Sequence, residues 1–382
     1  MDKDSKGANK EKFQRVHLQE DLGEELTRPQ LSYWKDAWIR LTKNKGAIAG
    51  LIVIVFIVLL ALIGPLMNDY SMEEANYDAA YLPAKVKGLE WLGLDGLQTY
   101  EVQGKSEEEA LKRGLESYDI EEKYVENVEI VQEPSEDNDN YYTVAMEVDI
   151  YAARGQEDSY YWFGTDSMGR DLWTRIWKGT QISLYIGILA AMIDMIVGVL
   201  YGGISGYYGG RVDNYMQRVI EVLSGIPNLV VVILMIMLLD PGLLAITIAL
   251  TITGWIGMAR IVRGQVLKLK NQEFVLAART LGANDKRILM KHLIPNVTSV
   301  IIINTMFTIP SAIFFESFLS FIGLGLQPPV ASLGTLIDTA FDDYRVYPYM
   351  LLFPAVIISL LMIGFNILAD GLRDALDPKM RK

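Results

Sequence analysis

Long apolar stretches separated by charged segments dominate the pattern of this chain. Residues 47–67 form 21 consecutive uncharged positions, enough for a helix to cross the roughly 30 Å hydrocarbon core of a bilayer. Five further apolar stretches follow, at 182–204, 219–239, 241–258, 297–321 and 350–368. The pattern therefore predicts an all-α polytopic membrane protein with six transmembrane helices.

The distribution of Lys and Arg predicts the orientation of these helices, because cytoplasmic loops retain positive charge. Lys35, Arg40, Lys43 and Lys45 crowd the start of the first helix, and residues 259–296 contain eight basic side chains against two acidic ones. We expect both segments to be cytoplasmic, and six crossings then place both termini there. No cleavage pattern of small residues follows 47–67, so we do not expect a cleavable signal peptide.

Acidic side chains are concentrated in one segment. Residues 68–162 contain 24 Asp and Glu against 7 Lys and Arg, a net charge of −17, whereas the whole chain has −12. This segment follows the first helix, so we expect it outside the cell. A helical pattern at 106–118 and alternating patterns at 125–133 and 141–151, around a polar turn at 134–140, predict a small α+β domain. A solvated acidic spacer is the alternative.

Composition removes several kinds of chemistry. The chain has no Cys and two His, which argues against thiol nucleophiles, disulfides and Cys/His zinc sites. The net negative charge argues against a nucleic-acid partner. Gly104-Lys105-Ser106 resembles part of a phosphate-binding loop, but the required earlier glycine is Thr99. We expect no catalytic residue, no metal site and no cofactor bound by this chain, so any ATP energy must come from another chain.

Two carboxylates fall within predicted membrane helices. Asp194 and Glu316 would each cost several kcal/mol at membrane depth unless they face a cavity or a partner. Both are therefore candidates for the translocation pathway, and hydrogen bonding between helices is the equally weighted alternative. The helix that contains Asp194 also has glycines at four-residue spacing, and we interpret this face as one for close helix packing rather than as a substrate groove.

The basic loop 259–296 has an ordered layout. Helix-favouring residues around Ala277, Ala278 and Arg279 precede Gly282, which can adopt the left-handed conformation that ends a helix. A second helical segment follows, and Pro295 can begin the next membrane helix. We predict two short helices on the cytoplasmic side, the first open to a partner. An amphipathic helix on the membrane surface is the alternative interpretation.

Four motifs resemble those of a known family. The spacing Ala277-Ala278-x-x-x-Gly282, with Ile294-Pro295 twelve residues later, is similar to the coupling loop of permeases from ATP-binding-cassette (ABC) importers. The general form has Glu directly before the two Ala; here Leu276 stands there and Glu273 lies three residues earlier, as in the peptide-importing branch. The motifs at 163–171, 316–329 and 366–378 also resemble the OppC/DppC-type permeases of that branch. The resemblance omits most of the acidic segment, where the usual family loop is much shorter.

This resemblance implies a fold, partners and a location. It implies the type I ABC importer permease fold, with the α+β segment as an extracytoplasmic insertion. It implies three kinds of partner: a related second permease, two ATPases that bind ATP and Mg, and an external substrate-binding protein, which is a lipoprotein in some bacteria. This chain itself would be embedded in lipid and would not be an enzyme. The location would be the bacterial plasma membrane. The expected divisions are 1–45, 46–67, 68–162, 163–370 with coupling loop 259–296, and 371–382.

The resemblance also assigns residues and a function. The ATPase-coupling residues would be Glu273, Ala277, Ala278, Arg279, Gly282 and Pro295. The outer-mouth motif would comprise Asp166, Gly169, Arg170 and Asp171. The expected function is import of oligopeptides or dipeptides, although similar permeases serve nickel, glutathione and some sugars. A proton-coupled secondary transporter using Asp194 and Glu316 is the alternative; it would usually have more helices and an internal repeat.

Overall fold

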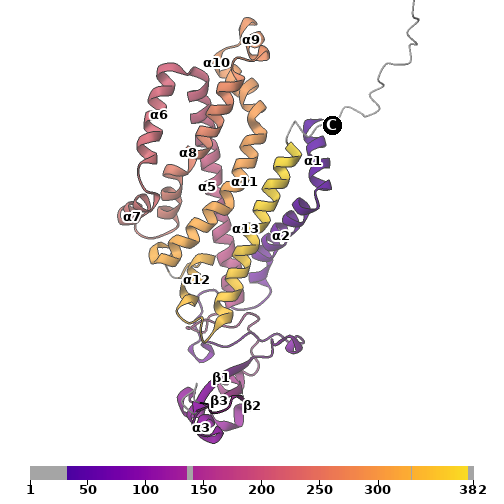
Figure 1. Cartoon of the computed structure of the whole chain (residues 1–382), viewed down its shortest axis with the longest axis vertical. Coiled ribbons are helices and arrows are strands. Elements are labelled where there is room, and N and C mark those ends of the chain that lie inside the picture. Colours follow the sequence, from indigo (N-terminus) through magenta and orange to yellow (C-terminus); the bar gives the residue numbers. More distant parts are fainter. Residues whose placement is uncertain (1–31, 136–140, 328, 377–382) are drawn as a thin grey trace, which may run out of the picture.

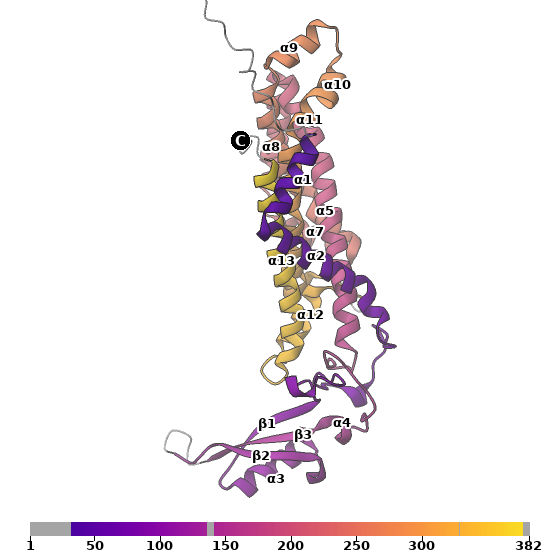
Figure 2. The ribbon, with the colours of Figure 1, turned by 90° about the vertical axis from the view of Figure 1, so that its right-hand side faces the viewer.

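The computed structural model describes residues 32–135, 141–327 and 329–376. They form a long helical bundle with a small sheet domain at one end (Figures 1 and 2). The N-terminal segment before residue 32, the basic end of the chain after 376 and most of the predicted turn 134–140 lie outside the described residues.

Five described helices are long and apolar enough to cross a membrane. They are centred on α2 (Lys45–Ile63), α5 (Leu172–Tyr208), α8 (Leu243–Leu269), α11 (Ile294–Leu319) and α13 (Pro348–Leu376). A polytopic all-α membrane fold is therefore confirmed.

The remaining predicted span is bent. Helices α6 (Gly210–Ser224) and α7 (Asn228–Leu239) meet at 79°, and they make a sixth span only if the bent pair is counted as one. The prediction of one continuous helix over 219–239 was wrong. Gly225 and Pro227 lie at the break, and Pro lacks the N–H that a continuing helix would use.

The glycine face of α5 packs closely against α8. A Cβ at Gly202 would collide with the main chain of Ala259, and one at Gly198 would lie 2.6 Å from Cβ of Met258. Gly206 similarly approaches the main chain of Arg263. The absent side chains thus let the two helix backbones approach closely, and the packing interpretation of this face is confirmed.

The sheet domain is a three-stranded antiparallel sheet with one helix. Strands β1 (Leu97–Gly104), β3 (Tyr142–Asp149) and β2 (Val125–Gln132) lie in the order β1-β3-β2, and α3 (Glu107–Tyr118) packs on β1 and β3. The predicted helix and two strands are confirmed, which excludes the spacer alternative for the described residues. Strand β1 was missed because its sequence, LQTYEVQG, is mostly polar.

Shorter elements connect these parts. The α-helical ones are α1 (Tyr33–Lys43), α4 (Ile150–Ala153), α9 (Glu273–Thr280), α10 (Asp285–Arg287) and α12 (Leu333–Phe341). Single 3₁₀ turns cover Gly64–Leu66, Tyr77–Ala79, Glu90–Leu92 and Glu122–Tyr124, and π-helical turns cover Ile288–Leu293 and Ser320–Leu324.

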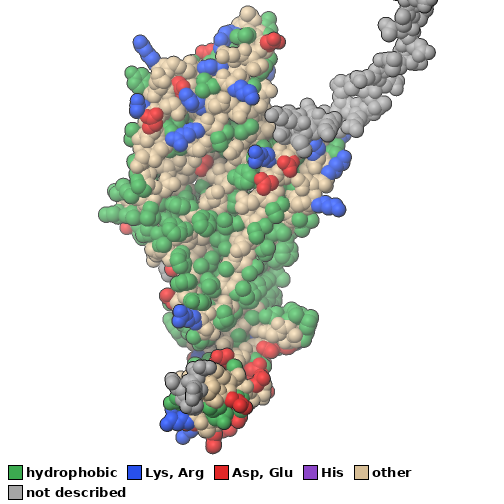
Figure 3. Space-filling view, in the orientation of Figure 1, with side chains coloured by type: hydrophobic (Ala, Val, Ile, Leu, Met, Phe, Trp, Pro, Cys, Tyr) green, Lys and Arg blue, Asp and Glu red, His purple; other side chains and the backbone are tan. Residues whose placement is uncertain are grey.

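Side-chain chemistry divides the molecule along its long axis. Figure 3 shows a band of hydrophobic side chains across the middle of the bundle. Lys and Arg lie mostly beyond this band at the end that carries α9, while Asp and Glu gather on the sheet domain at the opposite end. This separation is what a membrane-spanning bundle with one basic and one acidic aqueous face requires.

Candidate functional site

Helix α9 projects beyond the membrane helices at the basic end of the bundle (Figures 1 and 2). Val275 is fully buried and packs in the apolar cluster formed by the ends of α5, α8 and α11. The opposite side of α9 is open: Phe274 is 40% exposed and Leu281, just after the helix, is 88% exposed. Ala277 is exposed between them at helical spacing. Val275 is therefore the one fully buried side chain of α9, and the helix presents a small apolar surface outward.

Gly282 ends this segment as predicted. Its φ is +80°, in the left-handed region that favours glycine. The N–H of Gly282 donates to the carbonyl of Arg279, and the N–H of Ala283 donates to that of Ala278. These bonds satisfy carbonyl groups at the helix end and turn the chain toward α10, which Asn284 caps.

The second predicted helix of the loop is not separate from the membrane helix. Helix α10, the π-helical turn and α11 belong to one helical run over Asp285–Leu324. Pro295 stands at the start of α11, as predicted, but no interruption separates α11 from the turns before it. Pro295 lies near the first turn of α11, directly after the wide π turn, where its missing N–H is tolerated.

Polar contacts tie this end of the bundle together beneath α9. Asp213 accepts two hydrogen bonds from Arg263, both 2.6 Å, and joins α6 to α8. Tyr207 at the end of α5 donates to Asp285 in α10 at 2.6 Å. These short contacts join α6 to α8 and α5 to α10 next to α9.

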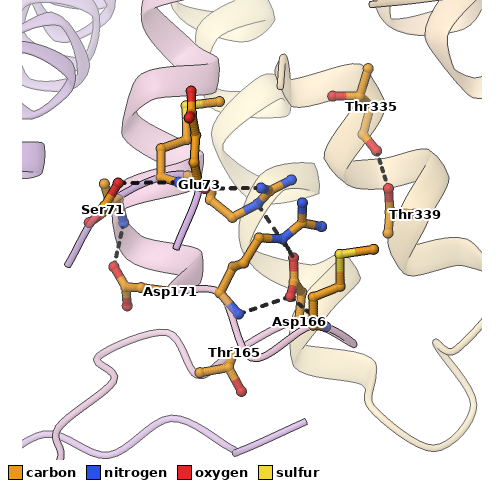
Figure 4. A network of polar contacts seen from close by, with 12 residues as sticks. Ser71, Glu73, Thr165, Asp166, Asp171, Thr335 and Thr339 are labelled. Atoms are coloured by element: carbon orange, nitrogen blue, oxygen red, sulfur yellow. Dashed lines mark hydrogen bonds and ion pairs between the residues drawn. The ribbon is translucent and has the colours of Figure 1, made fainter. Parts of the chain in front are cut away.

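The motif at 163–171 forms a buried turn at the end of the bundle next to the sheet domain (Figures 1 and 4). Asp166 is 2% exposed; its Oδ2 lies 2.7 Å from Nε of Arg170 and 3.5 Å from Nε of Arg175. Gly169 has a φ of +70°, and a Cβ there would collide with the carbonyl of Asn76. The motif thus joins the chain after the first span to the start of α5.

Asp171 caps α5 next to this turn. Its Oδ2 accepts the N–H of Thr174 at 2.8 Å and the side-chain N–H of Asn68 at 2.9 Å. Burial raises the pKa of the Asp171 carboxyl above its ordinary value, against these hydrogen bonds, which lower it. The four predicted outer-mouth residues therefore come together, and their charged groups face one another and the protein interior.

Glu316 is enclosed by serine hydroxyls. It is fully buried, accepts from Ser320 at 2.9 Å and from Ser183 at 3.2 Å, and lies near Ser317. Ser183 also accepts the N–H of Leu333 at the start of α12. The carboxyl of Glu316 therefore links α5, α11 and α12 in the bundle core, apart from Asp194.

Asp194 instead lines a cavity of about 430 Å³. The cavity lies between α5, α8 and α11, and the described residues around it include Asn228, Thr253, Gly254, Asn304, Thr308 and Ser311. Asp194 is 6% exposed, and its Oδ1 has no hydrogen-bond partner in the part of the chain that the structure describes. Among the residues that the structure describes, no group of three His, Asp or Glu side chains is placed to hold a metal ion.

Sequence comparison identifies two matching families. The one described as "Binding-protein-dependent transport system inner membrane component" matches residues 198–382, and "N-terminal TM domain of oligopeptide transport permease C" matches 32–84. The sheet domain lies between these two matches.

Curated relatives cover nearly the whole chain. The dipeptide transport system permease protein DppC of Bacillus subtilis is 42% identical over 358 residues, covering 94% of this chain and 89% of that protein. The oligopeptide transport system permease protein OppC of Bacillus subtilis is 40% identical and covers 94% of each chain. A chain of the methionine ABC transporter MetNI overlays with a TM-score of 0.45 at 18% identity, covering 53% of this chain and 96% of that chain.

Proposed function

Because this chain belongs to the OppC/DppC-type permeases of binding-protein-dependent transport systems, we propose that it forms half of the translocation pathway of an ABC importer for oligopeptides or dipeptides. The observation that carries the substrate class is the 42% identity to a dipeptide permease along 94% of the chain. ATP and Mg would be bound by partner subunits, and this chain would catalyse no reaction.

Coupling to an ATPase would occur through α9. The exposed side of this helix, with Phe274, Ala277 and Leu281, is suited to a cleft in a soluble partner, because small and apolar side chains allow close approach. Glu273 and Arg279 are exposed at its two ends and could form the polar rim of the contact. The family residues Ala278, Gly282 and Pro295 would hold the shape of the segment.

The burial of Val275 supplies the mechanical link. A partner that moved α9 would push directly on the cluster that contains the ends of α5, α8 and α11. Two arrangements of these helices, whose equilibrium ATP binding biases, would then open the pathway alternately to each side.

The cavity beside Asp194 supports a pathway role for this part of the bundle. It is bounded on two sides by α8 and α11, and Gly254 and Ser311 on these helices are exposed at its edge. A second permease packed on this face would complete a passage between the two subunits. Glu316, enclosed by serines, would serve the bundle core instead.

The full assembly would contain this chain, a related second permease, two ATPases and an extracytoplasmic binding protein, which would be a lipoprotein in some bacteria. It would lie in the bacterial plasma membrane, with both termini of this chain in the cytoplasm. The acidic sheet domain would then extend outward, where it could contact the binding protein.

Mass spectrometry of the complex extracted gently from native membranes tests this proposal. We expect a second permease of similar size, ATPases with intact phosphate-binding loops and an extracytoplasmic binding protein. Recovery of this chain alone, or with partners that lack a phosphate-binding loop, would contradict the proposal.

A further inference from the structure

The cavity between α5, α8 and α11 contains one ionisable group, Asp194. This side chain is more than nine-tenths buried, and its Oδ1 lacks a hydrogen-bond partner among the described residues. A carboxylate at membrane depth without a partner carries a large desolvation cost, so a ligand that neutralises it would be bound favourably. Among the described residues, no Lys, Arg or His lines the cavity.

The backbone beside Asp194 is shaped around its carboxylate. A Cβ at Gly254 in α8 would lie 2.5 Å from Oδ2 and 2.6 Å from Oδ1 of Asp194. Any side chain at position 254 would therefore push the carboxylate out of its place. The glycine keeps the charge against the wall of the cavity and leaves the space in front of it open.

The other polar groups of the cavity mostly offer lone pairs. The hydroxyls of Thr308 and Ser311 donate to main-chain carbonyls one turn earlier in α11, at 3.0 and 2.9 Å. Thr253 donates to Asn228 at 3.0 Å. Each hydroxyl hydrogen is thus already engaged, and each hydroxyl oxygen can still accept. A ligand rich in donors fits this lining better than an anion does.

Aromatic rings add to the preference for a cation. Phe307 and Phe315 of α11 line the same cavity, and the faces of aromatic rings attract ammonium groups. A hard metal ion would need several oxygen ligands around it, and Asp194 is the one carboxylate in the lining. An organic ammonium, with three N–H donors and a soft surface, matches the mixture of one carboxylate, hydroxyl oxygens and rings.

We propose that this cavity binds the α-ammonium group of a peptide in transit, with Asp194 as its counter-ion. The identity of the ligand as a peptide rests on the proposed function, whereas the preference for an ammonium group rests on the cavity alone. Asp194 would make passage selective for substrates with a free amino terminus, and Gly254 would act as a positioning residue for the carboxylate.

Thiol labelling tests the proposal, because the chain contains no native Cys. Ser311→Cys places a thiol in the cavity of the assembled importer in lipid nanodiscs. Mass spectrometry of this chain then follows its reaction with a cationic aminoethyl and an anionic sulfonatoethyl methanethiosulfonate, each normalised to its rate with a free thiol. We expect the cationic reagent to react about tenfold faster, since a buried charge concentrates counter-ions.

Two further variants locate the cause. When Asp194→Asn is added to the Ser311→Cys protein, the ratio of the cationic to the anionic labelling rate should fall to about one. When Gly254→Ala is added instead, the ratio should fall because the carboxylate is displaced. Asp240→Asn removes an exposed carboxylate before α8 and should leave the ratio unchanged.

Peptide protection tests the ligand itself. Tetraalanine should slow labelling, N-acetyl-tetraalanine should not, and Asp194→Asn should abolish the difference. Any of three results would overturn the proposal: a labelling-rate ratio that Asp194→Asn does not change, equal protection by both peptides, or a thiol that reacts with neither reagent. These measurements need neither ATP nor transport. If the labelling tests fail but the importer still takes up peptides, only the ammonium site is rejected. If peptide uptake or recovery of the partner subunits fails, the proposed function itself is rejected.

Discussion

Two family motifs at opposite ends of the molecule differ in what their side chains face. At the end of the bundle next to the sheet domain, the motif at 163–171 directs Asp166 and Arg170 into the protein, where Asp166 pairs with both Arg170 and Arg175. At the basic end, α9 directs Phe274 and Leu281 away from the bundle. The first motif uses its polar groups to hold three chain segments together, and the second leaves an apolar surface without an internal partner.

The contrast shows that a motif by itself does not identify an interface. Burial separates the two cases: Asp166 is 2% exposed, whereas Leu281 is 88% exposed. Changes in the outer turn should therefore affect folding first. Changes on the open side of α9 should affect coupling to a partner and leave folding intact.

The largest effect on stability is expected for Asp166→Ala. The change leaves Arg170 and Arg175 buried without their carboxylate, and breaking a buried pair in this way costs about 3–5 kcal/mol. The thermal unfolding of the purified chain in detergent, followed by tryptophan fluorescence, measures this loss. Asp158→Ala, an exposed position in the same outer region, should change little. Equal midpoints for the two variants would show that the outer turn is not a structural unit.

Gly282→Pro should abolish coupling while the chain still inserts into the membrane. Proline has a φ near −65° and cannot adopt the +80° found here, so the segment after α9 must change its path. We expect ATP-dependent uptake by the reconstituted importer to fall about 100-fold, because misplacing a coupling element removes the productive state. Gly282→Asn is the matched control, since Asn tolerates the left-handed region. Normal uptake by the proline variant would refute the coupling role of this turn.

Ala277→Trp should reduce uptake about tenfold without changing the unfolding midpoint, since a bulky group on the open side blocks close docking and disturbs no internal packing. Binding of the ATPase to the detergent-solubilised permease should weaken in parallel. Lys112→Trp, an exposed change on α3 of the sheet domain, provides the control for added bulk. If both tryptophan variants behave alike, the open side of α9 is not the docking surface.

Removal of the sheet domain should have the smallest effect on the transport cycle. Leu97 and Asp149 are directly paired across β1 and β3, so a short glycine linker can replace residues 98–148 while the outer turn stays in place. We expect uptake to fall about threefold at low concentrations of binding protein and to recover at high concentrations, as lost contact area predicts. Unchanged uptake and unchanged affinity for the binding protein would remove the proposed contact.

The features predicted from the sequence are those set by local pattern. The length of the apolar stretches predicted the membrane helices, and the alternation of apolar and polar residues predicted β2 and β3. Gly282 predicted the end of α9. Strand β1 was missed because its polar residues become a strand only through pairing with β3. The bend before α7 lies at Pro227, and it was missed because the apolar stretch 219–239 continues through this proline.

The two membrane carboxylates show where local pattern stops. Asp194 and Glu316 look alike in the sequence, each a single acid in an apolar helix. The groups that distinguish them come from distant segments: Ser183 of α5 donates to Glu316, whereas Gly254 of α8 leaves Asp194 beside a cavity. The sequence predicts both residues as candidates, but their environments differ only through tertiary packing.

Peptide uptake into proteoliposomes that contain the complete importer tests the central claim most directly. We predict that a labelled dipeptide accumulates only when ATP is present on the side that α9 faces, that a proton gradient cannot replace ATP, and that Ala277→Trp lowers the rate. Uptake driven by a proton gradient without ATP or ATPases, and lost in Asp194→Asn, would contradict the account and identify a secondary transporter.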